Sequence, residues 1–258
     1  MNLSENPFTR ALASGNRQVG LWVTLCSNFA AEVVAPAGFD WALIDMEHSH
    51  NDYASVLGQL QAFAAYDTVP IVRVEWNDAV AVKRLLDLGA PGLLFPMIQT
   101  VEEARAAVAA TRYPPHGIRG VSGSTRATKF GRIKDYTARI EDETAVLLQI
   151  ETQAALERAE AIAEVEGVTG IFFGPADIAA DMGMLGQPTA REVWEKIRPV
   201  ARRLMAKGMP VGTLVSDTTL AAELLGEGFT FVACGTDTGL LARGSDALLS
   251  EMKGKLNR

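Results

Sequence analysis

Two polar side chains share one face of a segment that is otherwise apolar. Gln149 and Glu151 alternate with Leu148 and Ile150 at the end of the run Ala145–Glu151. Alternate residues of a β-strand point to the same face, so the Gln and the Glu would face the same way. Burying such groups costs roughly 2 kcal/mol or more each unless a partner compensates. We therefore expect both side chains to contact a ligand, a metal ion or an opposite charge.

A second carboxylate, Asp177, follows the next apolar run, Gly170–Gly174. If these runs are neighbouring strands, Glu151 and Asp177 lie at adjacent strand ends and can share one divalent cation. Oxygen ligands, with water or substrate completing the shell, suit Mg²⁺ or Mn²⁺. In the alternative interpretation, Glu151 pairs with Arg73 in a buried salt bridge. Spacing alone leaves both interpretations open.

His48 is the candidate for proton transfer, because histidine titrates near neutral pH. The chain has only three histidines, and Asp45 precedes His48 by three residues, so Asp45 could orient its ring. Alternatively, His48 and His50 are solvated residues of a polar loop. No lysine lies in a predicted strand or at a strand end, which disfavours Schiff-base chemistry.

Eight short apolar runs alternate with amphipathic stretches along the chain, as is typical of parallel strands covered by helices. This number of units in about 250 residues predicts a (β/α)₈ TIM barrel of the α/β class, as one domain over residues 1–258. A doubly wound open sheet is the alternative, but no G-x-G-x-x-G follows the first run. The runs are Val19–Leu25, Trp41–Met46, Val69–Val74, Gly92–Ile98, Ala145–Glu151, Gly170–Gly174, Pro210–Val215 and Phe229–Gly235.

A barrel of this type carries its active site at the C-terminal ends of the strands. The candidate residues named above all fall at those ends. Asn6–Ser14 is expected to form an extra helix that closes the opposite end. The long connection Tyr113–Arg132, rich in glycine, is expected to cap the barrel or to contact another subunit.

Composition narrows the classes of function. The 258 residues carry a formal charge of −7, which argues against nucleic-acid binding. No apolar stretch approaches the roughly 20 residues of a membrane span, and the N-terminus shows no secretory signal, so we expect a cytoplasmic protein. Cys26 and Cys234 are too few to form a disulfide framework.

Motifs along nearly the whole chain resemble those of the HpcH/HpaI family of metal-dependent (class II) pyruvate aldolases, with 4-hydroxy-2-oxoheptanedioate aldolases as the most similar type. Each motif is weak by itself, but their order and spacing together are specific. They are Ile44–His48, Val72–Val74, Gly117–Gly120, Gln149–Thr152, Gly174–Ile178, Asp181–Gly183, Gly186–Pro188 and Asp237–Arg243.

The resemblance implies an enzyme, a carbon–carbon lyase that joins pyruvate or a close 2-oxo acid to an aldehyde through a metal-stabilised enolate. Glu151 and Asp177 would hold the divalent metal, Mg²⁺ or Mn²⁺ with Co²⁺ as a further alternative. Arg73 would stabilise the enolate oxygen. His48, oriented by Asp45, would act in proton transfer.

The resemblance also implies how the substrate is held. Gln149 would position it, Trp22 would lie beside it, and its carboxylate would meet the backbone of the three residues that follow the sixth run. These residues are Gly174, Pro175 and Ala176.

Relatives of this kind are homohexamers that exchange a C-terminal helix, here Asp237 to about Leu256. Asp87 would reach the site of a neighbouring subunit. His50 and the segment Thr128-Lys129-Phe130 depart from the usual pattern of the family, which puts the identity of the aldehyde in doubt.

Two other functions remain to be weighed. A lyase for citryl- or malyl-CoA thioesters would use similar enolate chemistry, but such enzymes usually have a longer chain and a basic surface for CoA. A barrel that only binds or scaffolds has no reason to keep Arg73, Glu151 and Asp177 together, since burying them is unfavourable.

Overall fold

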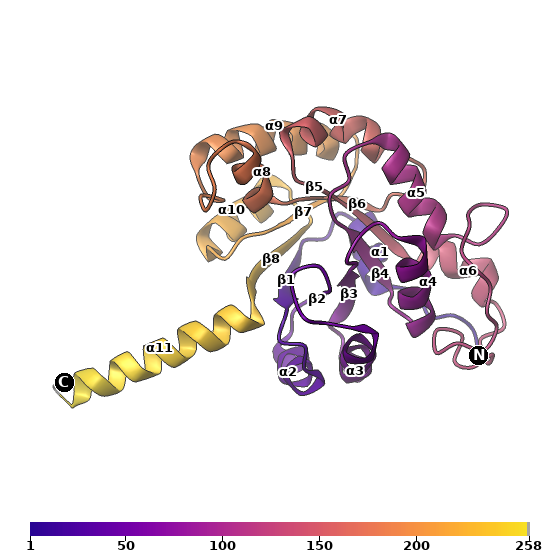
Figure 1. The fold of residues 1–258 in the computed structure, drawn as a ribbon, viewed down its shortest axis with the longest axis horizontal. Helices are drawn as coiled ribbons and strands as arrows, with labels where there is room; N and C mark the ends of the chain where they lie inside the picture. Colours follow the sequence, from indigo (N-terminus) through magenta and orange to yellow (C-terminus); the bar gives the residue numbers. More distant parts are fainter. Residues whose placement is uncertain (257–258) are drawn as a thin grey trace.

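The computed structural model describes residues 1–256 and shows a closed barrel of eight parallel strands (Figure 1). The strands pair in chain order, and the last closes the barrel against the first. The predicted (β/α)₈ fold is confirmed. The strands are β1 (Gln18–Val23), β2 (Trp41–Asp45), β3 (Val69–Arg73), β4 (Gly92–Phe95), β5 (Ala145–Ile150), β6 (Gly170–Phe173), β7 (Val211–Leu214) and β8 (Phe231–Thr236).

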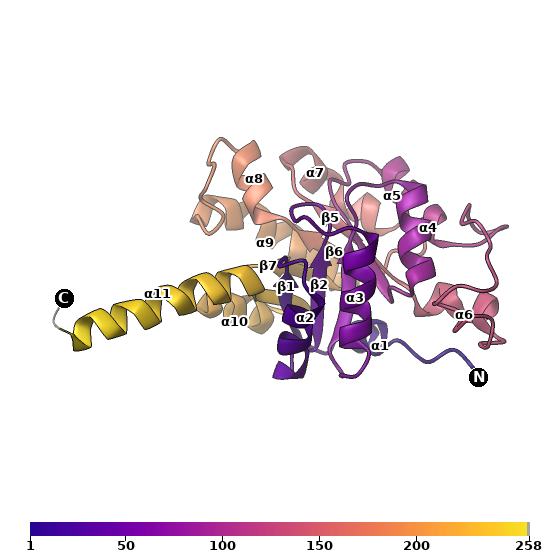
Figure 2. The same cartoon turned by 60° about the horizontal axis from the view of Figure 1, so that its bottom comes forward.

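Helices follow the strands and cover the outside of the barrel (Figures 1 and 2). Side chains fix where many of them begin. Asp52 and Thr100 form capping boxes with Ser55 and Glu103, for example, and so satisfy amide groups that a helix start leaves free. The helices are α1 (Pro7–Ala13), α2 (Asn28–Val34), α3 (Tyr53–Phe63), α4 (Ala79–Leu88), α5 (Val101–Thr111), α6 (Tyr136–Glu143), α7 (Gln153–Ala163), α8 (Pro175–Asp181), α9 (Arg191–Ala206), α10 (Thr218–Glu227) and α11 (Asp237–Lys255), with a short 3₁₀ turn at Ala35–Ala37.

A column of aromatic rings fills the inside of the barrel. Phe8 of α1 closes one end, packing 5.8 Å between ring centres from both Trp41 and Phe231 at the starts of their strands. Phe172 continues the column 6.2 Å from Phe231, and Trp22 packs 5.5 Å from Phe172. The helix that was expected to close this end of the barrel is therefore confirmed as α1. The aromatic side chains fill the interior between α1 and the C-terminal ends of the strands.

The long connection before β5 lies beside α4 and does not line the mouth of the barrel. Arg119 donates to Asp87 Oδ1 at 2.9 Å, and Arg126 donates to the Leu88 carbonyl oxygen at 2.6 Å. The expectation that this connection caps the barrel is wrong, because these bonds hold it against the flank. Contact with another subunit stays a prediction.

Helix α11 projects away from the barrel (Figures 1 and 2). Its first residue, Asp237, anchors it by accepting hydrogen bonds from the amides of Thr24 and Leu25 at 2.9 and 3.1 Å. Beyond that turn the helix is exposed and carries large apolar side chains. These are Leu240, Leu241, Leu248, Leu249 and Met252, with Leu256 just after the helix. The expected exchange between subunits stays a prediction.

Across residues 1–256, no helix combines the length and the apolar character needed to cross a lipid bilayer.

Candidate active site

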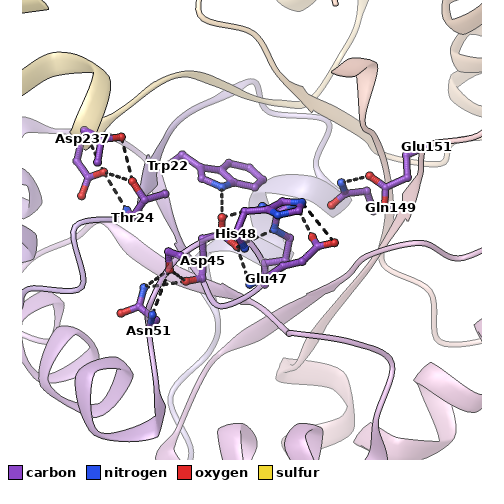
Figure 3. Close-up of polar contacts among 12 residues, drawn as sticks. Trp22, Thr24, Asp45, Glu47, His48, Asn51, Gln149, Glu151 and Asp237 are labelled. Atoms are coloured by element: carbon purple, nitrogen blue, oxygen red, sulfur yellow. Dashed lines mark hydrogen bonds and ion pairs between the residues drawn. The ribbon is translucent and has the colours of Figure 1, made fainter. Parts of the chain in front are cut away.

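A cavity of about 340 Å³ opens at the C-terminal ends of the strands. Figure 3 shows Trp22, Asp45 and His48 on one side of this region and Gln149 with Glu151 across from them. Asp45 and Glu151 lie behind the wall and bond to residues that form it. The predicted residues that line the cavity are Trp22, His48, Arg73, Gln149, Gly174, Pro175, Ala176 and Asp177.

Arg73, the last residue of β3, is held in place from two sides. Its Nε and Nη2 donate to the two oxygens of Asp45 at 2.9 and 2.7 Å, and its Nη1 lies 2.7 Å from Glu47 Oε2 in an ion pair. Glu47 Oε2 has no hydrogen-bond donor of suitable geometry among the described residues, so its contact with Arg73 is an ion pair and not a hydrogen bond. Trp22 Nε1 also donates to Asp45, at 3.2 Å. A bidentate pair of this kind fixes the plane of the guanidinium.

The charge state of Asp45 follows from these contacts. Burial alone would raise its pKa, but the hydrogen bonds and the charge of Arg73 outweigh burial and hold the pKa below the ordinary value of 3.8. Asp45 is therefore an anion that neutralises Arg73 in the protein interior. Its Oδ1 also accepts from the amides of Glu47 and His48, which shapes the loop after β2.

Glu151 does not pair with Arg73, so the alternative interpretation from the sequence is wrong. Its Oε1 accepts from the amide of Met97 at 2.6 Å, and its Oε2 accepts from Gln149 Nε2 at 2.5 Å. Met97 has φ of 52°, a left-handed conformation that few residues other than glycine adopt. The backbone after β4 thus holds an unfavourable conformation where its amide meets the carboxylate, as is common at functional sites.

Gly174 allows the backbone to approach this carboxylate closely. A Cβ at that position would lie 2.7 Å from Glu151 Oε2 and 3.1 Å from Gln149 Nε2. Any side chain there would displace one or both groups. The glycine at the end of β6 is thus required by close approach.

Three carboxylates meet here with too little positive charge. The pKa of Glu151 is raised to about 7, mainly by burial, with the charges of Glu47 and Asp177 adding to the shift and the hydrogen bonds from Met97 and Gln149 opposing it. Burial likewise raises the pKa of Glu47, with Arg73 opposing and Asp45 and Asp177 adding to the shift. Charged carboxylates gathered in a partly buried site favour a cation.

The residues fit a divalent metal ion that takes part of its ligands from the protein and the rest from water or substrate. Asp177 lies in the first turn of α8 and lines the cavity, and Glu151 lies at the end of β5. The carbonyl oxygen of the Gln149 side chain is buried and has no hydrogen-bond donor among residues 1–256. Within the same residues no three His, Cys, Asp or Glu side chains are grouped so that they could hold a metal ion, which leaves an arrangement with two carboxylates. Two carboxylates with water and substrate are a common arrangement for Mg²⁺.

His48 lies at the rim with its side chain 66% exposed. Its ring Nε2 lies 3.6 Å from Glu47 Oε1, whereas Asp45 reaches only its backbone amide, at 3.4 Å. The expectation that Asp45 orients the His48 ring therefore needs correction, because the ring faces Glu47. The polar-loop interpretation is correct about its exposure, although the ring still reaches the cavity.

Asp87 is not brought into the cavity of its own chain. It lies on α4, partly buried, and pairs with the fully buried guanidinium of Arg119 at 2.9 Å. A role at a neighbouring subunit's site stays a prediction.

The sequence reasoning missed two residues of the site. Glu47 could have been found, because it follows β2 directly and so lies at the C-terminal ends of the strands, where a barrel of this type carries its active site. Met97 acts through its backbone amide, and nothing in its residue type signals that role.

Comparisons with known proteins agree with this arrangement. The chain is 55% identical to a protein from Rhizobium etli named pyruvate aldolase, over 96% of this chain and 98% of that one. It is 50% identical to a 4-hydroxy-2-oxo-heptane-1,7-dioate aldolase from Klebsiella pneumoniae, over 94% of this chain and 92% of that one. A crystal structure of an HpcH/HpaI aldolase/citrate lyase family protein from Burkholderia cenocepacia superposes with a TM-score of 0.93 at 37% identity, covering 96% and 99% of the two chains. The model of the HpcH/HpaI aldolase/citrate lyase family matches residues 18–244, and the chain belongs to that family.

Proposed function

We propose that this chain is a divalent-metal-dependent aldolase that adds pyruvate or a close 2-oxo acid to an aldehyde and cleaves 4-hydroxy-2-oxo acids in reverse. One observation carries the proposal. A buried carboxylate whose pKa is raised to about 7, Glu151, lies across one cavity from a rigidly held arginine, Arg73. Aldolase names among relatives at about half identity support the same reaction.

Glu151 and Asp177 hold the metal, for which Mg²⁺ or Mn²⁺ suits oxygen ligands and Co²⁺ is an alternative. When bound, the cation polarises the 2-oxo group and so lowers the free energy of forming an enolate. Met97 and Gln149 fix the two oxygens of Glu151, which keeps that carboxylate in one orientation. Gly174 leaves the space that this orientation needs.

Arg73 places a fixed positive charge where the enolate oxygen develops. Because Asp45 holds two of its nitrogens, the guanidinium does not need to reorient during the reaction. Trp22 supports it, with the guanidinium carbon 5.0 Å from the centre of the indole ring.

The substrate carboxylate binds at the start of α8. Pro175 is the first helical residue, and the amides at the start of a helix have no partners within the helix. The Gly174 amide already donates to the Ile150 carbonyl oxygen at 3.0 Å and Pro175 has no amide hydrogen, so the Ala176 amide and the side chain of Gln149 position the 2-oxo acid.

His48, at the rim of the cavity, is the residue proposed to transfer protons. His48 Nε2 lies there beside Glu47 Oε1, and an exposed imidazole exchanges protons readily with water. In the aldol direction, His48 takes part in moving the proton lost from the pyruvate methyl group.

The active assembly is proposed to be a homohexamer with exchanged α11 helices. The exposed leucines of α11 support this, and so does Asp87, which faces away from the cavity of its own chain. A cytoplasmic location also stays a prediction. No observation favours a CoA-thioester lyase or a non-catalytic barrel over the aldolase.

Deuterium exchange into the pyruvate methyl group, followed by NMR, tests the function without knowledge of the aldehyde. We expect exchange with Mg²⁺ or Mn²⁺ and none after EDTA treatment. Arg73→Ala should slow it roughly 100-fold or more, and Arg73→Lys should not restore it, since lysine lacks the planar fork that Asp45 holds. Absence of exchange with every metal would disprove the proposed function.

A further inference from the structure

The outer wall of the cavity comes from two loops to which no role has been assigned so far. The loop after β7 contributes Val215, Ser216 and Asp217, and the loop after α8 contributes Pro188 and Thr189. These residues lie on the part of the cavity wall that the 2-oxo acid and the metal ligands do not use. With the 2-oxo acid and the metal placed as in the proposed function, these residues are the part of the wall left for the aldehyde.

Little positive charge is free in this cavity. Among the side chains of this chain that line it, Arg73 is the one permanent cation. All three of its nitrogens already face Asp45 or Glu47 at 2.7 to 2.9 Å. A second carboxylate, carried by the aldehyde, would thus find no unpaired cation on this wall.

Asp217 adds negative charge at the same wall. It is exposed and begins α10, where its Oδ1 accepts from the amides of Thr219 and Leu220 at 2.8 and 3.1 Å. Neither of these bonds uses Oδ2. The neighbouring hydroxyl groups of Ser216 and Thr189 can donate to or accept from uncharged hydroxyl groups.

We propose that Asp217 is a specificity-determining residue, which favours uncharged, hydroxylated aldehydes and disfavours aldehydes that carry a second carboxylate. This inference rests on the proposed function and deepens it. In the reaction, a carbon–carbon bond forms between the pyruvate methyl carbon, which loses a proton, and the aldehyde carbon, whose oxygen gains one. Like charge at Asp217 raises the free energy of this step for an anionic acceptor.

Two four-carbon aldehydes isolate the effect of charge: 4-hydroxybutanal, which ends in a hydroxymethyl group, and succinate semialdehyde, which ends in a carboxylate and is not a 2-oxo acid. The measurement is kcat/KM for each with saturating pyruvate and Mg²⁺, taken as the ratio of succinate semialdehyde to 4-hydroxybutanal. Within each variant this ratio cancels changes in the metal and the enolate.

Asp217→Asn and Asp217→Ser both keep a residue type that caps helices well. We expect each to raise the ratio about fivefold, the size expected for one like charge about 4 Å away that is screened as in bulk water, because Asp217 is exposed. Asp78→Asn is the matched control. Asp78 caps α4 through the same two-bond geometry, at 2.9 and 2.8 Å, and does not line the cavity. Its ratio should equal that of the wild type.

An unchanged ratio in both Asp217 variants would overturn the inference, and so would an equal rise in Asp78→Asn. Pyruvate deuterium exchange separates this failure from failure of the function. Normal exchange with an unchanged ratio would overturn only the role of Asp217. Absence of exchange in the wild type would overturn both proposals.

Discussion

The mouth of the barrel and helix α11 depart from the usual pattern of burial in opposite directions. At the mouth, Glu151 is 2% exposed and Arg73 is 6% exposed, although charged side chains are rarely buried. On α11, Leu248 is 64% exposed and Leu241 is 61% exposed, although a row of leucines on a helix normally packs against something.

The two departures suit different partners. Polar groups gathered inside a protein need a compensating charge or hydrogen bond, which suits the mouth to a small polar ligand. Apolar side chains gathered on a projecting helix need a surface to cover them, which suits α11 to another protein surface. A second copy of this chain is the partner that the family resemblance implies. The comparison thus separates a site for chemistry from a site for assembly.

The largest expected effect concerns the mouth. Glu151→Ala and Asp177→Ala should each remove metal-dependent pyruvate exchange, a loss of roughly 1,000-fold or more, because the metal carries much of the enolate's charge. Calorimetry should show that Mn²⁺ binding is lost as well. Glu103→Gln, which alters a helix cap outside the cavity, serves as the control. An active double variant that EDTA does not inhibit would rule out the metal.

The second effect concerns α11. Leu241→Glu combined with Leu248→Glu should convert the oligomer to smaller species, since the two residues lie two turns apart on one face and each buried leucine contributes roughly 2 kcal/mol. Light scattering measures the mass. Ser250→Glu, on the same exposed helix, should leave it unchanged. A wild-type protein that is monomeric at micromolar concentration would refute the exchange.

Strand periodicity explains how much of this could be predicted. Gln149 and Glu151 were found because a period of two places them on one face, and the eight apolar runs gave the barrel. Glu47 lies just beyond β2, where the period of the strand no longer applies, so its contact with Arg73 depends on the path of the loop.

Other features depend on information that no residue pattern carries. The left-handed conformation of Met97 arises from the packing of the loop after β4 against Glu151, not from a glycine at that position. The length of the connection before β5 gave no sign that Arg119 and Asp87 would hold it to the flank of the barrel. The surface that we propose to cover α11 belongs to a second chain, which no local pattern describes.

The smallest expected effect is on the stability of the fold. It tests whether the buried carboxylate at the mouth of the barrel, and not helix α11, makes stability depend on pH. Glu151 has an ordinary pKa of 4.5, which burial raises to about 7, so the folded protein holds a proton that the unfolded chain releases. Stability of the metal-free protein should therefore fall as pH rises from about 4.5 through about 7, by roughly 3 kcal/mol at most. Urea unfolding at several pH values measures this loss.

Glu151→Gln should flatten that decline, because the amide does not titrate. Mg²⁺ should also oppose it in the wild type, since a cation favours the charged carboxylate and binds only the folded site. In the Leu241→Glu, Leu248→Glu variant, the part of the decline due to Glu151 should persist, because α11 contributes no group to this cavity. If the loss of stability disappeared in the Leu241→Glu, Leu248→Glu variant but remained in Glu151→Gln, the group that titrates would belong to the surface of α11. The assignment of the titrating carboxylate to the mouth of the barrel would then be wrong.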